Sequence, residues 1–365
     1  MKKKVCIVLP SLGVGGAQRS GAVVSQMLYD AGMDVSVVIT QSDVVFEYAG
    51  TLHSVKNSVK SKNKLLKFIQ TFIVFRRIMH SEKFDCIIDG RHRRTWIKQK
   101  FIESFVYPKL PKVYIVNNCE LGIYLPSKKW MVHDIYSKAL KVIGVANQVT
   151  ELVKERFDLK NVQTIYNTIY PDQVIRLANE YETSIKDKYI LYFGRLQENE
   201  KNVSFLIDSY ASSILPNKGI QLLIVGTGID EKKLKDKVFE MNLETHIAFL
   251  GFNANPFPYV KDALFTTLTS HFEGFPMVLI EALVLGTPVV AVDCPSGPSE
   301  IIRTGINGVL TPIYDQEAYT NALNSMIENE NFYNNCKKNA STSVESFLPE
   351  KIKEQWATLI DGIKS

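Results

Sequence analysis

Features typical of disulfide-bonded secreted proteins, of proteins with a structural metal site and of membrane-spanning proteins are scarce in this sequence. Its 365 residues include only 5 cysteines, scattered along the chain without a C-x-x-C pair. This pattern argues against a disulfide framework and against a zinc site. The longest apolar stretches, such as FIQTFIVF, fall far short of the roughly 18–20 residues that a membrane span needs. We therefore expect a cytoplasmic protein with reduced thiols that does not cross a membrane.

Low-complexity tracts and internal repeats are also missing, and no secretory signal is apparent. The start MKKKVCIVLPSLG is basic, but its apolar run is shorter than the roughly 7–15 residues of a signal core, so we expect a β-strand there. Hydrophobic residues make up 45% and charged residues 22% of the sequence, as in ordinary globular proteins. A chain of this length predicts two domains.

Short β-branched runs alternate with helical patterns along the whole chain. The first half contains VCIVLP, VSVVIT, CIID, VYIVN, VIGVA and VQTIYN, and the second half contains YILYFG, LLIVG, IAFLG, ALFTTL, VVAVD and GVLTP. Continuous apolar runs with helices between them indicate parallel strands covered on both faces. The sequence therefore predicts an α/β fold of two Rossmann-like, doubly wound domains facing a central cleft.

The boundaries follow from composition. A polar segment that is poor in strand formers, YPDQVIRLANEYETSIKDKY, separates the two sets of strands. We therefore expect an N-terminal domain over residues 1–170 and a C-terminal domain over residues 187–347. The last residues, 348–365, have the pattern of an amphipathic helix, and we expect this helix to pack back toward the N-terminal domain.

The two halves carry opposite charge. Residues 1–168 contain 26 Lys and Arg against 13 Asp and Glu, whereas the remainder contains 17 against 25. The basic half should face an anionic partner, and nucleic acid is the weaker alternative because no nucleic-acid motif accompanies the charge. Residues 56–77 mix basic and large apolar side chains. They predict either an interfacial helix on anionic lipid or a core-packed helix with a solvated basic face.

Three arginines follow the strand CIID and form a candidate anion-binding site. In DGRHRRTWIK they are Arg91, Arg93 and Arg94. Guanidinium groups bind phosphate oxygens in a forked geometry. We expect these arginines to meet a phosphate group of the anionic partner.

A glycine-rich turn follows the first strand. Gly13, Gly15 and Gly16 lead into a helix from about Ala17, and a helix N-terminus binds anions readily. Gln18 stands where a dinucleotide fingerprint needs its third glycine, and no Walker lysine follows. A phosphate or sugar contact is favoured over NAD binding and over a purely structural turn.

A basic pair follows the first strand of the second half. Arg195 comes directly after Gly194 at the expected strand end, and Lys201 stands six residues later, before the helix NVSFLIDSY. Two cations at the carboxyl edge of a parallel sheet beside a helix N-terminus predict a diphosphate clamp. The alternative is a pair of solvated surface charges.

Two glutamates interrupt the apolar run EGFPMVLIEALVLG. Pro276 and Gly286 delimit a short helix that holds Glu281, and Glu273 precedes it. At about 1.5 Å rise per helical residue, the carboxylates lie on the order of 8–10 Å apart. This separation fits two contacts on one extended ligand, but it also fits an inverting glycosidase pair.

Several motifs together resemble one known family. GVGGAQR, GRLQENEKN, the E-x7-E run and GINGVL are similar, in the same order, to the motifs of GT-B retaining glycosyltransferases of family four. The resemblance implies transfer of a sugar from a UDP-sugar to a lipid-linked or glycan acceptor by same-face displacement, with no cofactor and no metal. DCPSGPSEII resembles galactosyl- and N-acetylhexosaminyl-type enzymes of bacterial lipopolysaccharide and capsule synthesis.

The resemblance also implies roles for individual residues. Glu273, Arg195 and Lys201 are the catalytic set, in which the cations neutralise the leaving diphosphate and the glutamate holds the sugar. Glu281 holds the ribose, and the loop 252–256 lies near the base. The implied donor-binding residues are Gly15, Gly16, Arg195, Lys201, Asn253, Glu273, Gly274, Phe275 and Glu281.

The sequence departs from the family pattern at one place of consequence. Many members carry a histidine after an N-domain strand, whereas here Asn117 and Asn118 stand in VYIVNNCE. Together with Arg91, Arg93 and Arg94, they are the candidates for binding the acceptor. Two rival functions stay open on the same fold. One is a sugar-nucleotide epimerase or glycoside hydrolase, and the other is a non-catalytic sugar-nucleotide sensor at a membrane.

Overall fold

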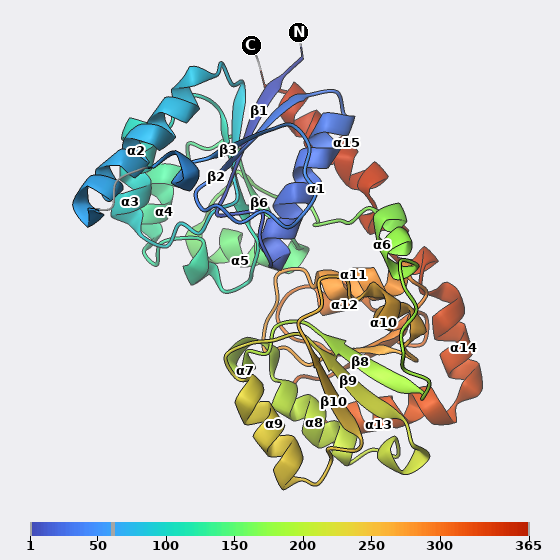
Figure 1. Ribbon diagram of the computed structural model, residues 1–365. Coiled ribbons are helices and arrows are strands. Elements are labelled where there is room, and N and C mark those ends of the chain that lie inside the picture. Colours follow the sequence, from blue (N-terminus) through green and yellow to red (C-terminus); the bar gives the residue numbers. More distant parts are fainter. Residues whose placement is uncertain (1, 60–62, 364–365) are drawn as a thin grey trace. The chain divides into compact units, whose positions relative to one another are not determined.

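The computed structural model describes residues 2–59 and 63–363 and divides the chain into two compact units (Figure 1). Unit 1 consists of Met1–Thr168 together with Pro349–Ser365, and unit 2 consists of Ile169–Leu348. The chain therefore returns to unit 1 for its last helix, α15 (Pro349–Asp361), which packs against α1 (Gly16–Asp30).

Seven parallel strands form the sheet of unit 1, in the order β3-β2-β1-β4-β5-β6-β7. All six strands predicted in the first half are present. The sequence analysis missed β3 because its residues, TLHS, lack an apolar run and are partly exposed at the sheet edge. The strands are β1 (Lys4–Leu9), β2 (Asp34–Ile39), β3 (Thr51–Ser54), β4 (Cys86–Asp89), β5 (Lys112–Val116), β6 (Lys141–Gly144) and β7 (Val162–Thr164).

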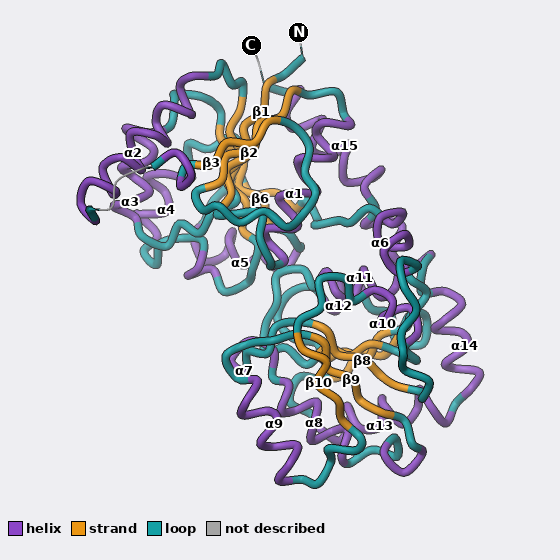
Figure 2. Tube along the Cα trace, in the orientation of Figure 1, coloured by secondary structure: helices purple, strands orange, loops and turns teal. Residues whose placement is uncertain are grey.

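Helices cover both faces of this sheet. In Figures 1 and 2, α2, α3 and α4 lie on one side, and α1 and α15 lie on the other. The remaining helices of unit 1 are α2 (Lys64–Ser81), α3 (Trp96–Phe101), the π-helix η2 (Ile102–Val106), α4 (Lys129–Tyr136) and α5 (Asn147–Phe157), with short 3-10 turns η1 (Lys56–Ser58) and η3 (Leu121–Ile123).

Unit 2 repeats the architecture with six parallel strands in the order β10-β9-β8-β11-β12-β13. Counted from the first strand of each unit, both sheets follow the strand order 3-2-1-4-5-6 of the Rossmann fold. The predicted α/β class is thus confirmed. The strands are β8 (Tyr189–Phe193), β9 (Gln221–Val225), β10 (Ile247–Gly251), β11 (Thr266–Leu268), β12 (Val289–Val292) and β13 (Gly308–Thr311).

The segment that the sequence analysis assigned to a linker contains a helix of unit 2. This helix, α6 (Pro171–Ala178), packs against α10 and α11. The other helices are α7 (Glu198–Lys201), α8 (Val203–Ala211), α9 (Glu231–Glu240), α10 (Phe257–Asp262), α11 (Met277–Val284), α12 (Pro298–Ile301), α13 (Gln316–Glu328) and α14 (Glu330–Asn339), with 3-10 turns η4 (Pro216–Lys218) and η5 (Thr342–Phe347).

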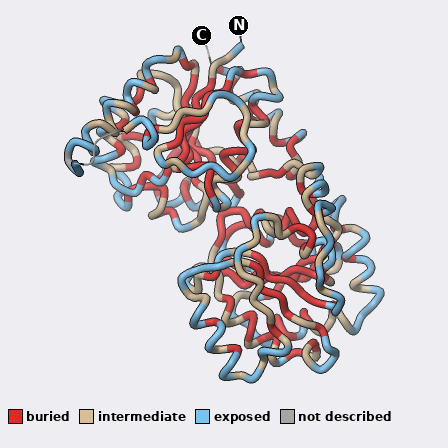
Figure 3. Tube along the Cα trace, viewed as in Figure 1, coloured by how far each residue is buried: buried red, intermediate tan, exposed pale blue. Residues whose placement is uncertain are grey.

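Each unit has its own hydrophobic core around its sheet (Figure 3). Strands β1, β2, β4, β5, β8, β9 and β12 are buried along nearly their whole length, which explains their continuous apolar sequences. Among the residues that the structure describes, every helix is too short or too polar to cross a bilayer.

Candidate active site

The strand order changes direction at the same place in each sheet, between the first strand and the fourth of the Rossmann order. In unit 2 these strands are β8 and β11. Ligands of doubly wound sheets bind beyond the carboxyl ends of the strands at such a switch point. Arg195 and Lys201 follow β8, and Glu273 follows β11. The fold therefore brings the predicted catalytic set to one edge.

Close backbone contacts fix the segment after β8. Gly226, which follows β9, has a φ of +138°, and a Cβ on it would lie 1.9 Å from the carbonyl oxygen of Gly194. A Cβ on Gly228 would lie 2.0 Å from the carbonyl oxygen of Leu196. Only glycine permits these approaches, so the two loops hold the start of the basic segment in place.

The glutamate loop is attached to the basic segment. The hydroxyl of Thr269 donates to the carbonyl of Lys201 (3.1 Å), and the backbone N–H of His271 donates to the carbonyl of Glu200 (2.8 Å). These bonds join the loop after β11 to the short helix α7. They set the position of Glu273 relative to the lysine.

Lys201 and Glu273 form an ion pair in which Nζ lies 2.6 Å from Oε1. The hydroxyl of Ser270 donates to the same carboxylate oxygen (2.7 Å). The side chains of Lys201 and Glu273 are 18% and 12% exposed. Within the described residues Oε2 of Glu273 has no hydrogen bond, so this oxygen can accept one from a ligand hydroxyl.

Arg195 is the more accessible cation. Its side chain is 60% exposed and lies 3.6 Å from the carboxylate of Glu200. Its carbonyl accepts a hydrogen bond from the hydroxyl of Tyr192 (2.8 Å). Burial raises the pKa of Tyr192, so this hydroxyl stays protonated and continues to donate. The backbone of Arg195 is held while its guanidinium can reach a phosphate.

One part of the predicted clamp is wrong. The sequence analysis placed the N-terminus of the following helix, α8, beside the cations as a further anion site. In the structure the carboxylate of Glu198 accepts the backbone N–H groups of Val203 (2.7 Å) and Ser204 (3.1 Å). Because a carboxylate already occupies these donors, they are closed to a phosphate.

Three further predicted donor residues, Gly274, Phe275 and Glu281, belong to the segment after β11 and to α11. Glu281 is 4% exposed within α11, and its separation from Glu273 stays a prediction. The carbonyl of Gly274 accepts from the hydroxyl of Ser296 (2.6 Å). Phe275 is buried with its ring 5.2 Å from that of Phe347, so only its backbone is available to a donor.

The predicted place of Asn253 near the base stays a prediction, and its side chain has local hydrogen bonds. Its amide nitrogen donates to the hydroxyl of Tyr181 (2.9 Å), and its amide oxygen accepts from the backbone N–H of Asn255 (2.9 Å). Both ends of the side chain therefore stabilise the loop after β10.

The arginine prediction in unit 1 fails for two of its three residues. Arg91 and Arg93 are 7% and 2% exposed, and both pair with Asp89, at 2.6 Å and 3.4 Å. Tyr107 also donates to this carboxylate (2.8 Å). A buried carboxylate needs such partners, so the two arginines neutralise Asp89 and are closed to an acceptor. Arg94 is exposed and stays a candidate.

The pKa shifts in this cluster agree with its geometry. Burial raises the pKa of Asp89, but the charges of Arg91 and Arg93 outweigh burial and leave it below the usual value. Burial lowers the pKa of Arg91, and attraction to Asp89 more than restores it. The cluster is therefore ionised throughout the neutral range.

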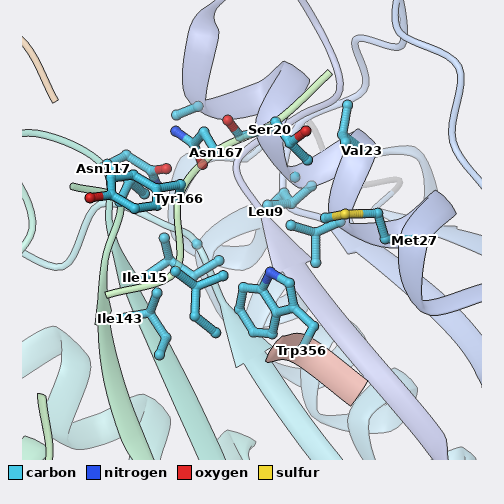
Figure 4. A pocket seen from close by; sticks show the side chains of 17 residues that line it. Leu9, Ser20, Val23, Met27, Ile115, Asn117, Ile143, Tyr166, Asn167 and Trp356 are labelled. Atoms are coloured by element: carbon cyan, nitrogen blue, oxygen red, sulfur yellow. The ribbon is translucent and has the colours of Figure 1, made fainter. Parts of the chain in front are cut away.

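Of the two predicted acceptor residues after β5, Asn118 has a local role. The amide oxygen of Asn118 accepts the backbone N–H of Glu120 (2.7 Å). Asn117 lines a cavity of about 10 Å³ beside Ser20 and Asn167 (Figure 4). The side-chain oxygens of Asn117 and Ser20 have no partner within the described residues. The cavity has room for about one water molecule, and contact of Asn117 with an acceptor stays a prediction.

The glycine turn adopts the expected geometry. Gly15 has a φ of +144°, and α1 begins at Gly16. The first turn of α1 has no acidic residue and no side-chain cap, so its N–H groups are not neutralised by a carboxylate. Their contact with donor phosphates, like the cleft between the two domains, stays a prediction.

Comparison with known proteins decides the family. Residues 175–343, nearly all of unit 2, match the family model of glycosyl transferases group 1. The chain carries the domain of this family in unit 2. Its candidate active site lies in the matched region.

Two relatives of this glycosyltransferase are bacterial sugar transferases by name. It is 26% identical, over 96% of its length and 97% of the relative's, to a Campylobacter jejuni protein named as a diphospho-undecaprenol-glycan 4-alpha-N-acetylgalactosaminyltransferase. It is 34% identical over 46% of its length to lipopolysaccharide 1,6-galactosyltransferase of Escherichia coli, of which it covers 47%. It is thus a transferase of the kind used in bacterial polysaccharide synthesis.

The fold of the glycosyltransferase is GT-B. The crystal structure of HepE from Anabaena in complex with UDP and glucose aligns with a TM-score of 0.77, at 19% identity, over 98% of this chain and 99% of that one. The predicted fold family is confirmed by this likeness.

Sequence reasoning missed two residues of the site. Ser270 shares Oε1 of Glu273 with Lys201, and Glu198 closes the N-terminus of α8. Each had a signal. The serine stands three residues before its glutamate, and Glu198 stands five residues before the start of the helix that it caps.

Proposed function

We propose that this glycosyltransferase moves a hexose or N-acetylhexosamine from a UDP-sugar to a lipid-linked or glycan acceptor, with retention and without a metal. The products belong to bacterial cell-surface polysaccharide, namely capsule, O-antigen or lipopolysaccharide. The protein works in the cytoplasm at the inner face of the plasma membrane. The observation that supports this most is the Lys201–Glu273 pair at the switch point of unit 2.

The charges at this edge suit a nucleotide diphosphate. Arg195 and Lys201 place two cations at the carboxyl ends of the strands, and the sheet of unit 2 has the Rossmann order. Oε2 of Glu273 is the acceptor for a sugar hydroxyl. Glu281 binds the ribose, and the N–H groups at Gly15 and Gly16 bind the phosphates.

The proposed mechanism is a same-face displacement. Negative charge develops on the diphosphate as the sugar leaves, and Arg195 and Lys201 stabilise it electrostatically. Glu273 fixes the orientation of the sugar, which lowers the entropic part of the barrier. The leaving phosphate takes the proton of the acceptor hydroxyl, so neither carboxylate has to act as a base.

The names of the relatives suggest which donor sugars and which acceptor to test first. The Campylobacter jejuni protein is named for N-acetylgalactosamine transfer to a diphospho-undecaprenol glycan, and the Escherichia coli protein for galactose transfer. We therefore propose UDP-galactose and UDP-N-acetylgalactosamine as the first donors to test, with UDP-N-acetylglucosamine kept from the sequence motif as a third, and a lipid diphosphate glycan as the first acceptor.

The test is a donor panel. The purified protein is incubated with UDP-, GDP- and ADP-sugars, with and without bacterial lipid extract and with and without EDTA, and nucleotide release is measured. The proposal predicts release of UDP that requires the extract and resists EDTA. The anomeric configuration of the product, read by NMR, tests retention.

Other results of the panel point to the rival functions. Conversion of the sugar without extract indicates an epimerase or hydrolase. Binding of a UDP-sugar without consumption in any extract indicates a sensor. Either result contradicts the proposal.

A further inference from the structure

Helix α2 has apolar side chains on two opposite faces. Phe75 and Met79 are buried in the core of unit 1. Leu66, Ile69 and Ile73 follow a spacing of three and four residues, which places them on one side of the helix. They are 53%, 45% and 60% exposed. Packing within unit 1 explains the first face but not the second.

The exposed apolar surface continues onto the neighbouring helices. The rings of Phe72 and Phe101 lie 4.9 Å apart, and those of Phe101 and Phe105 also lie 4.9 Å apart. The guanidinium of Arg76 donates to the carbonyl of Phe105, which fastens η2 to α2. We name this the α2–η2 surface, made of Leu66, Ile69, Ile73, Ile97, Phe101 and Phe105, each 41% to 72% exposed.

The charge around this surface has one sign. Helix α2 carries Lys64, Lys67, Arg76 and Arg77 and no acidic residue. All four are exposed, and within the described residues they form no ion pair.

The acidic residues of the adjoining helices do not offset these charges. Glu103 of η2 pairs with Lys112 at 3.3 Å, and Asp134 of α4 pairs with Lys100 at 2.6 Å. The cations of α2 therefore stand beside apolar side chains without a protein counter-charge.

This combination selects an anionic bilayer over a protein partner. Lysine is depleted in the cores of protein interfaces because a flat partner desolvates it. At a bilayer, long cationic side chains reach the lipid phosphates while apolar neighbours enter the acyl boundary. Cations close to an anionic leaflet each add to binding, so the charge and the apolar side chains act together there.

We infer that the α2–η2 surface docks unit 1 on a bilayer that contains anionic lipid. The inference deepens the proposed function, on which its biological setting rests, because a lipid-linked acceptor lies in such a bilayer. Residues 60–62, part of the segment that suggested an interfacial helix, lie outside the described residues and are not needed. The sequence left two alternatives for this segment, an interfacial helix and a core-packed helix. Helix α2 has features of both, because one face is buried in the core and the opposite face exposes apolar side chains.

The experiment is sedimentation of the whole protein with vesicles. One set contains phosphatidylcholine alone, and the other contains equal parts of phosphatidylcholine and phosphatidylglycerol. The wild type should bind the anionic vesicles and be released by salt. Ile69→Ser with Ile73→Ser should weaken binding at least about tenfold, since even partial burial of two isoleucines contributes more than the corresponding 1.4 kcal/mol.

The matched control changes two exposed apolar residues of unit 2. Phe239 on α9 and Ile175 on α6 are 69% and 44% exposed, so replacing both by serine removes similar area. This control should bind the anionic vesicles as the wild type does. Equal binding by the α2 double variant, or an equal loss in the control, overturns the inference.

Two further measurements distinguish bilayer docking from self-association and from catalysis. If the wild type dimerises on size exclusion, ignores vesicles, and the α2 variant is monomeric, the surface is an interface between copies and the inference is wrong. Acceptor-dependent UDP release is measured in the same preparations. If UDP is released but the protein does not bind vesicles, the inferred docking surface is wrong and the proposed function stands. If the protein binds vesicles but releases no UDP, the docking surface stands and the proposed function is wrong.

Discussion

The two units have the same strand order, but they use their switch points differently. In unit 1 the segment after β4 carries Arg91 and Arg93, and both are buried on Asp89. In unit 2 the loop after β11 carries Glu273, which pairs with a partly exposed Lys201 and keeps one oxygen without a hydrogen bond in the described residues. Equivalent positions in one fold thus hold a closed cluster in one unit and an open pair in the other.

The difference teaches that charge at a strand end is not enough to mark a ligand site. Both switch points have carboxylates and cations within ion-pair distance. What separates them is access to solvent, since Arg91 and Arg93 are buried whereas Lys201 is partly exposed. On this view, substitutions in the unit 1 cluster should change stability, and substitutions in the unit 2 pair should change activity.

The largest effect is expected from Asp89→Asn. It leaves Arg91 and Arg93 buried without a counter-charge, and breaking a buried pair costs about 3–5 kcal/mol. Hydrogen exchange should show faster exchange in β4 and β5 and little change in β8 and β11. The control Asp134→Asn breaks the partly exposed pair with Lys100 and should cost less than about 1 kcal/mol.

The same carboxylate predicts an acid dependence. Because the folded-state pKa of Asp89 is lowered, its ionised form stabilises unit 1 at neutral pH. This contribution declines as the pH falls below about 4, the usual value for Asp, and is lost once the pH passes the folded-state pKa. Asp89→Asn should make the stability of the protein less dependent on pH in this acidic range. If stability depends on pH as in the wild type, Asp89 is not the group whose protonation destabilises unit 1.

Glu273→Gln should reverse the pattern seen with Asp89. The amide keeps the shape of the side chain but loses the charge that orients the sugar, and turnover should fall about a hundredfold, in the range of single active-site hydrogen bonds. Loss of melting temperature should be smaller than for Asp89→Asn. Glu317→Gln, an exposed change on α13, is the control. If Glu273→Gln lowers the melting temperature strongly but leaves turnover unchanged, the expected contrast with Asp89 is contradicted.

A smaller effect is expected from Ser270→Ala. The hydroxyl contributes one hydrogen bond to Oε1 of Glu273, which amounts to about 0.5–1.5 kcal/mol. We expect kcat to fall severalfold with the affinity for UDP unchanged, because the serine positions the carboxylate and does not contact the nucleotide. Ser270→Thr keeps the hydroxyl and should restore most of the rate. Equal defects in both variants would mean that size, not the hydrogen bond, matters.

The twelve expected strands could be read from the sequence because buried parallel strands are continuous apolar runs. Edge strand β3 was missed since TLHS has no such run. Helix α6 was overlooked because it is only 8 residues long and its apolar residues stand in a segment that is otherwise polar. Local pattern therefore predicts most elements of the sheets but not their short or marginal additions.

Side-chain partners were harder to predict. Arg91 and Arg93 carried the same signal as Arg195, a cation after a strand end, yet the aspartate that closes CIID had already provided their partner. Asn253 likewise bonds to Tyr181, 72 residues away. Such contacts depend on how distant segments meet. Sequence identifies residues with suitable chemistry, and only the fold shows which of them are already engaged.

The most direct test of the central claim is transfer by Lys201→Ala. Acceptor-dependent release of UDP is measured beside Lys235→Ala, which changes a lysine of unit 2 that pairs with Glu231 on the surface of α9. Removing one preorganised charge from a transition state costs about 10²–10³ in kcat. We predict that loss for Lys201→Ala with an unchanged melting profile, and no loss for Lys235→Ala. Unchanged transfer by folded Lys201→Ala would contradict the assignment of the unit 2 switch point as the active site.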